Sequence, residues 1–177
     1  SYQSEQVTFL LKRTDIEPTD TVEKERLIQT GEKHYSQMIS LEHAPTARHL
    51  QLFEQAMQQG QQRLAQEVQQ LAQTLVEKFN EPMVLVSFVR AGGPLGVLLY
   101  RAIYDLGRNC VHYGISIIRD RGIDFAALET IIAKHGHESI VFVDGWTGKG
   151  AIRQELQRSL GNDARFAGRP LPLVVLS

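Results

Sequence analysis

The stretch that decides the fold runs from residue 83 to residue 89 and reads Met83-Val84-Leu85-Val86-Ser87-Phe88-Val89. It is almost continuously apolar and has the length of a strand, which is typical of a strand covered on both faces in a parallel sheet. The turn-forming sequence Asn80-Glu81-Pro82 precedes it, and a helix is predicted from Leu95 to about Leu106. A buried strand followed by a helix predicts the first unit of an α/β fold.

The same alternation continues to the end of the chain. Further strands are predicted at residues 111–118, 140–143 and 171–176, with helices at about 125–134 and 149–160. This pattern predicts a parallel, doubly wound sheet over residues 81–177. Because the last strand ends where another loop is expected, we expect this domain to be truncated at its C-terminus.

Residues 1–80 are predicted to form a helical region that packs on this core. Thr19 or Asp20 is placed to cap a short helix, and Pro45 opens a long amphipathic helix. Ten glutamines lie between Gln51 and Gln73, and the helical spacing of apolar residues persists through them, so we interpret them as a solvated helix face rather than a disordered tract. Residues 7–12 fit either a strand or a helical turn.

Composition excludes several classes of protein. The 177 residues include 42% hydrophobic residues and one cysteine, and the net charge is −1. One cysteine rules out a disulfide framework, and no apolar run approaches the roughly 20 residues that span a membrane. Residues 1–89 carry 8 Lys and Arg against 12 Asp and Glu, and residues 90–177 carry 11 against 8, too small a bias for a nucleic-acid-binding protein. We expect a cytoplasmic protein.

Ligands of doubly wound sheets bind at loops beyond the carboxyl ends of the strands. The first such loop is Arg90-Ala91-Gly92-Gly93-Pro94, whose glycines allow backbone N–H groups to approach an anion beside the Arg90 guanidinium. A tight strand-to-helix turn with a surface arginine is the alternative.

The loop at residues 144–150 adds an acid to the same chemistry. Asp144 directly follows a buried strand, and Thr147, Gly148, Lys149 and Gly150 precede a helix, where hydroxyl, ammonium and N–H groups can surround a phosphate. The spacing is not that of a Walker A loop. Asp144 could instead be a turn-forming or capping acid.

The third loop, residues 119–124, carries Arg119 and Arg121 beside Asp120 and Asp124. The alternative interpretation is a solvated surface cluster in which these charges pair with one another. The topology predicts that all three loops lie on one edge, where their four cations and Asp144 suit a polyphosphate that bears hydroxyls, with Mg²⁺.

Several of these segments resemble a known family. The glycine loop after the first strand and the segment Ile140-Val141-Phe142-Val143-Asp144 resemble the pyrophosphate and phosphoribosyl-diphosphate (PRPP) motifs of type I phosphoribosyltransferases. Residues 87–92, 112–119 and 141–152, together with residues 31–40, are more closely similar to phosphoribosyltransferase-like proteins of bacterial tellurite- and stress-resistance gene clusters. Some members of that family are named cysteine protease StiP.

The resemblance implies a transferase with an N-terminal helical extension. Arg90, Ala91, Gly92 and Gly93 would hold pyrophosphate. Thr147, Gly148, Lys149 and Gly150 would hold the 5′-phosphate of PRPP or a nucleotide-like ligand. Asp144 would orient the ribose, Arg119 and Arg121 would close over the pyrophosphate, and Mg²⁺ would bridge the two parts. The family motif has a second acid where this chain has Gly145.

Two other functions stay open at this point. A cysteine peptidase would need Cys110 as its nucleophile, with His112 two residues along the same strand. Cys110 is expected at the amino end of that strand, opposite the three loops, where a small buried side chain is the usual role. A non-catalytic nucleotide-sensing module, with the glutamine-rich helix as a docking surface, is the other function, and a homodimer is compatible with each.

Overall fold

The computed structural model describes residues 2–80, 82–168 and 170–176. The chain forms two compact units, of which the smaller is Lys12–Gln61 and the larger combines Ser1–Leu11 with Gln62–Ser177. These units divide the chain at positions other than residue 80. The division into domains of residues 1–80 and 81–177 stays a prediction.

The smaller unit contains α1 (Thr21–Gln29), the short 3₁₀ helix η1 (Tyr35–Gln37) and the first part of α2 (Ala47–Lys78). Asp20 caps α1, because its side chain accepts hydrogen bonds from the backbone N–H groups of Val22 and Glu23. Of the two predicted candidates, Thr19 and Asp20, the cap is therefore Asp20.

The larger unit is built on a parallel sheet. Its elements, in chain order, are β1 (Thr8–Phe9), the C-terminal part of α2, β2 (Met83–Phe88), α3 (Gly92–Asp105), β3 (Cys110–Ile115), β4 (Ile117–Ile118), β5 (Gly122–Ile123), α4 (Phe125–His135), β6 (Ile140–Val143), α5 (Ala151–Leu160) and β7 (Leu173–Val174). In the described residues the five strands of the sheet follow the order β1-β3-β2-β6-β7, and every pair is parallel. The predicted α/β class with a parallel sheet is confirmed, whereas this topology does not establish the phosphoribosyltransferase type.

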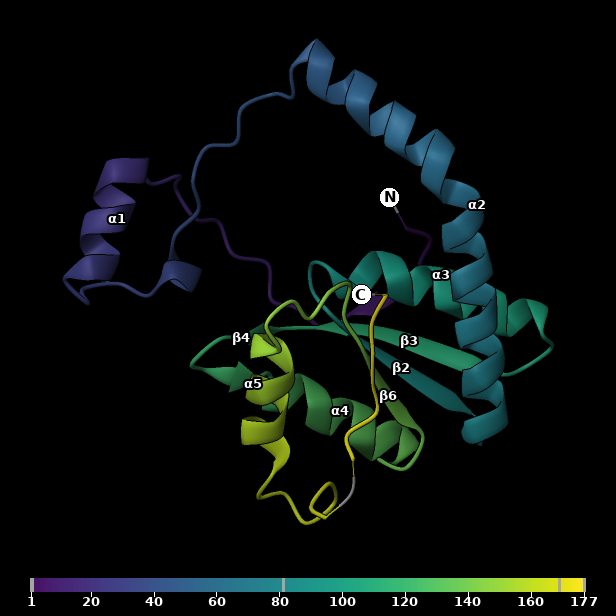
Figure 1. The fold of residues 1–177 in the computed structure, drawn as a ribbon. Helices are drawn as coiled ribbons and strands as arrows, with labels where there is room; N and C mark the ends of the chain where they lie inside the picture. Colours follow the sequence, from purple (N-terminus) through teal and green to yellow (C-terminus); the bar gives the residue numbers. More distant parts are fainter. Residues whose placement is uncertain (1, 81, 169, 177) are drawn as a thin grey trace. The chain divides into compact units, whose positions relative to one another are not determined.

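Side chains of β2 alternate between two hydrophobic cores, one on each face of the sheet. Val84, Val86 and Phe88 pack in the core beneath α4 and α5. Met83 and Leu85 pack in the other core, beneath α3 and the C-terminal part of α2. Figure 1 shows these helices on the two sides of the sheet. The continuous apolar run of β2 is therefore explained by a central strand that is covered on both faces.

The helix α2 changes character along its length. Val68, Ala72 and Leu75 of its apolar stripe are buried, whereas Phe53 and Met57 of the same stripe are exposed. All ten glutamines between Gln51 and Gln73 are exposed, so the predicted solvated glutamine face is confirmed.

The strand predicted at residues 111–118 is wrong in its second half. β3 ends at Ile115, and β4 pairs antiparallel with β5, with Ile117 opposite Ile123. The chain turns here because Asp120 and Gly122 adopt left-handed backbone angles, with φ of 65° and 90°. Residues 119–121 are thus the turn of a small hairpin. Residues 7–12, which the sequence left open, include the edge strand β1, which pairs with β3.

Candidate functional site

The carboxyl ends of β2 and β6 form the topological switch point of the sheet. These strands are neighbours, but the chain leaves β2 through α3 towards β3 and leaves β6 through α5 towards β7, on opposite faces. Open α/β sheets bind ligands in the crevice where neighbouring connections part in this way. Arg90 and Asp144 come from the two segments that border this point.

The two segments touch through glycines. A Cβ at Gly92 would collide with the carbonyl oxygen of Val143, and a Cβ at Gly145 would lie 2.6 Å from the carbonyl oxygen of Ala91. Gly92 and Gly93 belong to the first turn of α3, where the N–H of Gly93 bonds to the Arg90 carbonyl at 3.2 Å. Gly92 therefore serves the close approach of the backbones, and α3 starts at Gly92, earlier than Leu95, the predicted first residue.

This packing explains why Gly145 stands where the resembling motif has a second acid. Any side chain at residue 145 would press on the backbone of Ala91, since the Ala91 carbonyl carbon lies 3.1 Å from the Cβ position. The departure from the motif follows from the contact between the two segments.

Asp144 is buried at this edge, with 5% of its surface exposed. Its Oδ1 accepts the N–H of Gly145 at 2.9 Å, and its own N–H bonds to the Val174 carbonyl. Burial raises the pKa of the Asp144 carboxyl, and the Gly145 hydrogen bond offsets part of that effect.

Asp144 does not form a metal site in the part of the chain that is described. There, no group of three or more His, Cys, Asp or Glu side chains is placed to hold an ion. A lone carboxylate fits Mg²⁺ only when a ligand supplies further oxygens. The predicted Mg²⁺ and phosphate ligand stay predictions.

The predicted phosphate loop at residues 147–150 leads into α5. Gly148 and Gly150 adopt positive φ, of 48° and 80°, and the N–H of Gly150 bonds to the Thr147 carbonyl at 2.8 Å. Gly150 is the N-cap of α5 and provides no side-chain cap, while Lys149 is exposed beside it. The glycines thus make the turn into the helix, and the predicted helix start at Lys149 lies two residues too early.

The predicted arginines Arg119 and Arg121 lie in the hairpin turn, which is fixed to the side of α5. Glu155, buried on α5, accepts the N–H of Asp120 at 2.8 Å, and the Ser159 hydroxyl accepts the N–H of Ile123 at 3.2 Å. These two anchors lie about one and about two turns after Ala151, the first residue of α5. Arg90 and Asp144 therefore lie on two segments that contact each other. The hairpin turn that carries Arg119 and Arg121 is attached instead to α5, through Glu155 and Ser159.

A buried pair of polar side chains, Ser87 and His112, was missed by the sequence analysis. Their Oγ and Nε2 atoms lie 2.7 Å apart, and His112 Nδ1 lies 2.8 Å from the Gln6 carbonyl oxygen. Because that carbonyl can only accept, Nδ1 donates and Nε2 accepts from the Ser87 hydroxyl. Ser87 is fully buried and α3 passes over it at Gly96, so this hydroxyl is closed to substrates.

Cys110 begins β3 at the amino edge of the sheet, as expected. Its thiol lies 3.6 Å from the Val111 carbonyl oxygen, and burial raises the thiol pKa to about 12. A thiol nucleophile needs a lowered pKa or an adjacent base. His112 is engaged with Ser87 and Gln6, so it does not serve Cys110 as a base.

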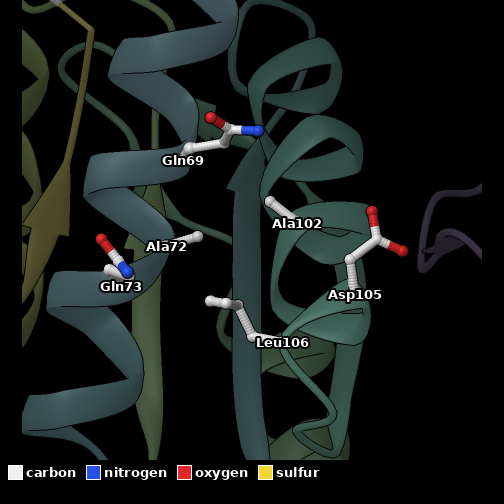
Figure 2. Close-up of a pocket in the computed structure, with 6 residues that line it drawn as sticks. All are labelled: Gln69, Ala72, Gln73, Ala102, Asp105 and Leu106. Atoms are coloured by element: carbon white, nitrogen blue, oxygen red, sulfur yellow. The ribbon is translucent and has the colours of Figure 1, made fainter.

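A groove between α2 and α3 lies towards the C-terminal end of α3. It has a volume of about 240 Å³, and Ala72 and Ala102 line it together with Gln69, Gln73, Asp105 and Leu106. Figure 2 shows Ala72 and Ala102 on facing helices, with the Gln69 side chain extending from α2 towards α3. Asp105 is its sole titratable group among the described residues, so the groove lacks a catalytic set.

None of the helices in the described ranges is long and apolar enough to cross a membrane. The predicted cytoplasmic location stays a prediction.

Comparisons with known proteins cover the whole chain. The family model described as "Tellurite-like stress resistance cysteine protease StiP" matches residues 1–177. A curated protein from Acinetobacter baylyi (strain ATCC 33305 / BD413 / ADP1), "Cysteine protease StiP", is 90% identical over 177 residues. That match covers 100% of this chain and 46% of the relative, so the chain spans about half the length of the protein it matches. No solved structure matches.

Proposed function

Because the chain belongs to the StiP family of tellurite-like stress resistance cysteine proteases, we propose that it acts as part of a cysteine protease in bacterial stress resistance. The observation that carries this proposal is the 90% identity, along its whole length, to a curated protein of that name. Tellurite and stress resistance agree with the context expected from the sequence.

The transferase function predicted from the glycine loop is wrong. The family model and the curated relative are both described as cysteine proteases, which are hydrolases. The glycine loop is a weak indication of a transferase, because Gly92 and Gly145 also meet the needs of backbone packing between the two segments.

The proposed protease does not use Cys110 as its nucleophile. This is the one cysteine of the sequence, and with a pKa of about 12 its thiolate fraction at neutral pH is on the order of 10⁻⁵. We therefore assign the nucleophile to the part of the longer relative that this chain does not span.

In this proposal the α/β unit binds the substrate. The carboxyl edge of its sheet carries Arg90 and the exposed Lys149 and Trp146, which offer cationic and apolar contacts to a peptide. Asp144, buried with a raised pKa, supports the turn between β6 and α5 through its bond to Gly145.

A chimera tests the function. The Acinetobacter baylyi protein would carry this chain in place of its matching 177 residues, and hydrolysis of a fluorogenic peptide library would be measured with and without iodoacetamide. We expect hydrolysis that iodoacetamide blocks, and equal hydrolysis by the Cys110→Ala variant. No hydrolysis would refute the protease function. Loss of hydrolysis in a folded Cys110→Ala variant would refute only the assignment of the nucleophile.

A further inference from the structure

The strand β1 forms one edge of the sheet, next to β3. Phe9 pairs with Gly114 of β3, and the N–H of Leu10 donates to the Gly114 carbonyl at 2.9 Å. Backbone groups of successive residues in a strand point to opposite sides, so the N–H and C=O groups of Phe9 point away from β3. Among the described residues, no backbone group bonds to Phe9 on that side.

The sequence around β1 does not prevent pairing with a further strand. Residues 6–11 read Gln6-Val7-Thr8-Phe9-Leu10-Leu11 and contain no charged residue and no proline. Natural sheets place such residues on their edges, because an open edge pairs readily with another extended chain. Both residues of β1 are exposed, so the edge is accessible.

A cavity of about 490 Å³ lies beside this edge, next to the carboxyl end of β2. Apolar side chains form most of its lining, namely Tyr2, Phe9, Leu11, Val89 and Pro94. Gly93 and Arg90 complete the lining, and Arg90 already has an interaction within the protein. Cavities of about 300–1,000 Å³ with a mostly apolar lining hold small ligands or apolar side chains.

The wall on the β1 side depends on a glycine of β3. Phe9 occupies the space over Gly114, where a Cβ would collide with its ring, and Val89 Cγ1 lies 3.3 Å from the same Cβ position. Tyr2 lies beside Phe9, with ring centroids 6.4 Å apart and planes tilted by 39°. Gly114 therefore lets the Phe9 ring lie against the sheet and form one side of the cavity.

The apolar lining is exposed to solvent. Tyr2, Phe9 and Leu11 are 46%, 44% and 43% exposed. Contiguous apolar surface around a cavity marks a binding site, because it is costly to leave in water. The edge and the cavity share Phe9, so one ligand can use both.

We propose that a peptide binds here in extended conformation, as an added strand beside β1, with a large apolar side chain in the cavity. The peptide backbone pairs with the N–H and C=O of Phe9, and Tyr2, Leu11 and Val89 surround the apolar side chain. Because β1 is two residues long, the backbone contributes few hydrogen bonds and the apolar side chain supplies most of the affinity.

This proposal rests on the proposed function in one respect, namely that the substrate of a protease is a peptide. It names the substrate class as extended segments with a large apolar residue. Binding needs no cleavage, so the site can be tested without hydrolysis.

Fluorescence anisotropy of labelled peptides on the 177-residue chain measures the contribution of the cavity. The peptides are nonapeptides of serine and threonine with either phenylalanine or alanine at the centre. We expect the phenylalanine peptide to bind at least about tenfold more tightly. Leu11→Ser should remove most of this preference. Tyr104→Ser changes a 69% exposed residue of α3 outside the cavity lining and should leave the preference intact.

N-methylated forms of the phenylalanine peptide test the strand pairing. Alternate residues of an extended peptide direct their N–H groups to the same side, so one alternate set faces β1. One peptide carries N-methyl groups on phenylalanine and every second residue from it, and another carries them on the residues between. We expect one of these to bind at least about tenfold more weakly than the unmethylated peptide, and the other within about twofold of it.

Equal binding of the phenylalanine and alanine peptides, equal effects of the two methylation patterns, or equal losses in Leu11→Ser and Tyr104→Ser would overturn the proposal. A dimer that forms without binding peptide and that Leu11→Ser dissociates would also overturn it, because a second copy of the chain would then occupy the edge. Each of these results leaves the protease function standing, since that depends on hydrolysis by the chimera. Peptide binding as expected, with no hydrolysis by the chimera, would refute the protease function alone.

Discussion

The Ser87 hydroxyl lies 2.7 Å from Nε2 of His112, and both side chains are buried between the sheet and α3. Burial lowers the pKa of His112 to about 4, although its bond to the Gln6 carbonyl acts in the opposite direction. A neutral histidine inside the core makes stability depend on pH.

We expect the free energy of unfolding to fall as pH drops from about 6.5 to about 4, because only the unfolded chain then binds a proton at His112. Protonation of His112 in the unfolded chain should lower the free energy of unfolding by about 3 kcal/mol between pH 7 and pH 4. Urea denaturation at several pH values measures it. His112→Gln should reduce the dependence of the unfolding free energy on pH. His49 is an exposed histidine on α2, and His49→Gln should leave that dependence unchanged. Equal slopes in wild type and His112→Gln would contradict the assignment.

Gly96→Ala should destabilise the protein by about 1–3 kcal/mol, because its Cβ would overlap Ser87 Oγ and the His112 ring. Gly93→Ala is the matched control on the same helix, since nothing lies within 4 Å of its Cβ position. That control should be neutral or stabilise α3 by up to about 1 kcal/mol. Urea denaturation compares them, and equal losses would show that the packing at Gly96 is not tight.

Gly145→Ala should also cost about 1–3 kcal/mol, because the new Cβ would lie 2.6 Å from the Ala91 carbonyl oxygen. Gly60→Ala, where the Cβ meets nothing within 4 Å, controls for the change of residue type. Thermal unfolding measures both. A Gly145→Ala protein as stable as wild type would mean that the two segments are not in contact.

Cys110 should react slowly with a thiol reagent in the native protein. With a thiol pKa of about 12, its thiolate fraction at pH 8 is on the order of 10⁻⁴. In denaturant the fraction should rise about a thousandfold, towards that of a free cysteine. Rates of reaction with Ellman's reagent, with and without urea, test this. A fast native reaction would reopen Cys110 as a nucleophile.

The apolar stripe of α2 should divide into two energetic classes. Leu75→Ala should cost about 2–5 kcal/mol, because Leu75 is 3% exposed in the core beneath α2 and α3. Met57→Ala, at 47% exposure on the same stripe, should stay within about 0.5 kcal/mol of wild type. Urea denaturation separates the two. Similar losses would show that the stripe is buried throughout.

Much of the fold is predictable from local pattern. The runs at residues 83–89 and 140–143 predicted their strands, because a central parallel strand needs apolar side chains on both faces. The single strand predicted at residues 111–118 was wrong beyond Ile115, because the β-branched residues Ile117 and Ile118 suit an extension of β3 and a separate hairpin strand equally well. Among the predicted site residues, Arg90 and Asp144 lie on contacting segments, whereas Arg119 and Arg121 follow the hairpin to the side of α5.

By itself the sequence determined the α/β class, the solvated glutamine face and the unsuitable place of Cys110 at the start of a strand. Tertiary structure alone decided which distant residues meet: Ser87 with His112, Gly145 with Ala91, and Phe9 with Gly114. The physical reason is strand register. Parallel pairing aligns β1, β3, β2 and β6 from separate parts of the chain, and a strand such as β2, buried along its whole length on both faces, presents apolar side chains in any register.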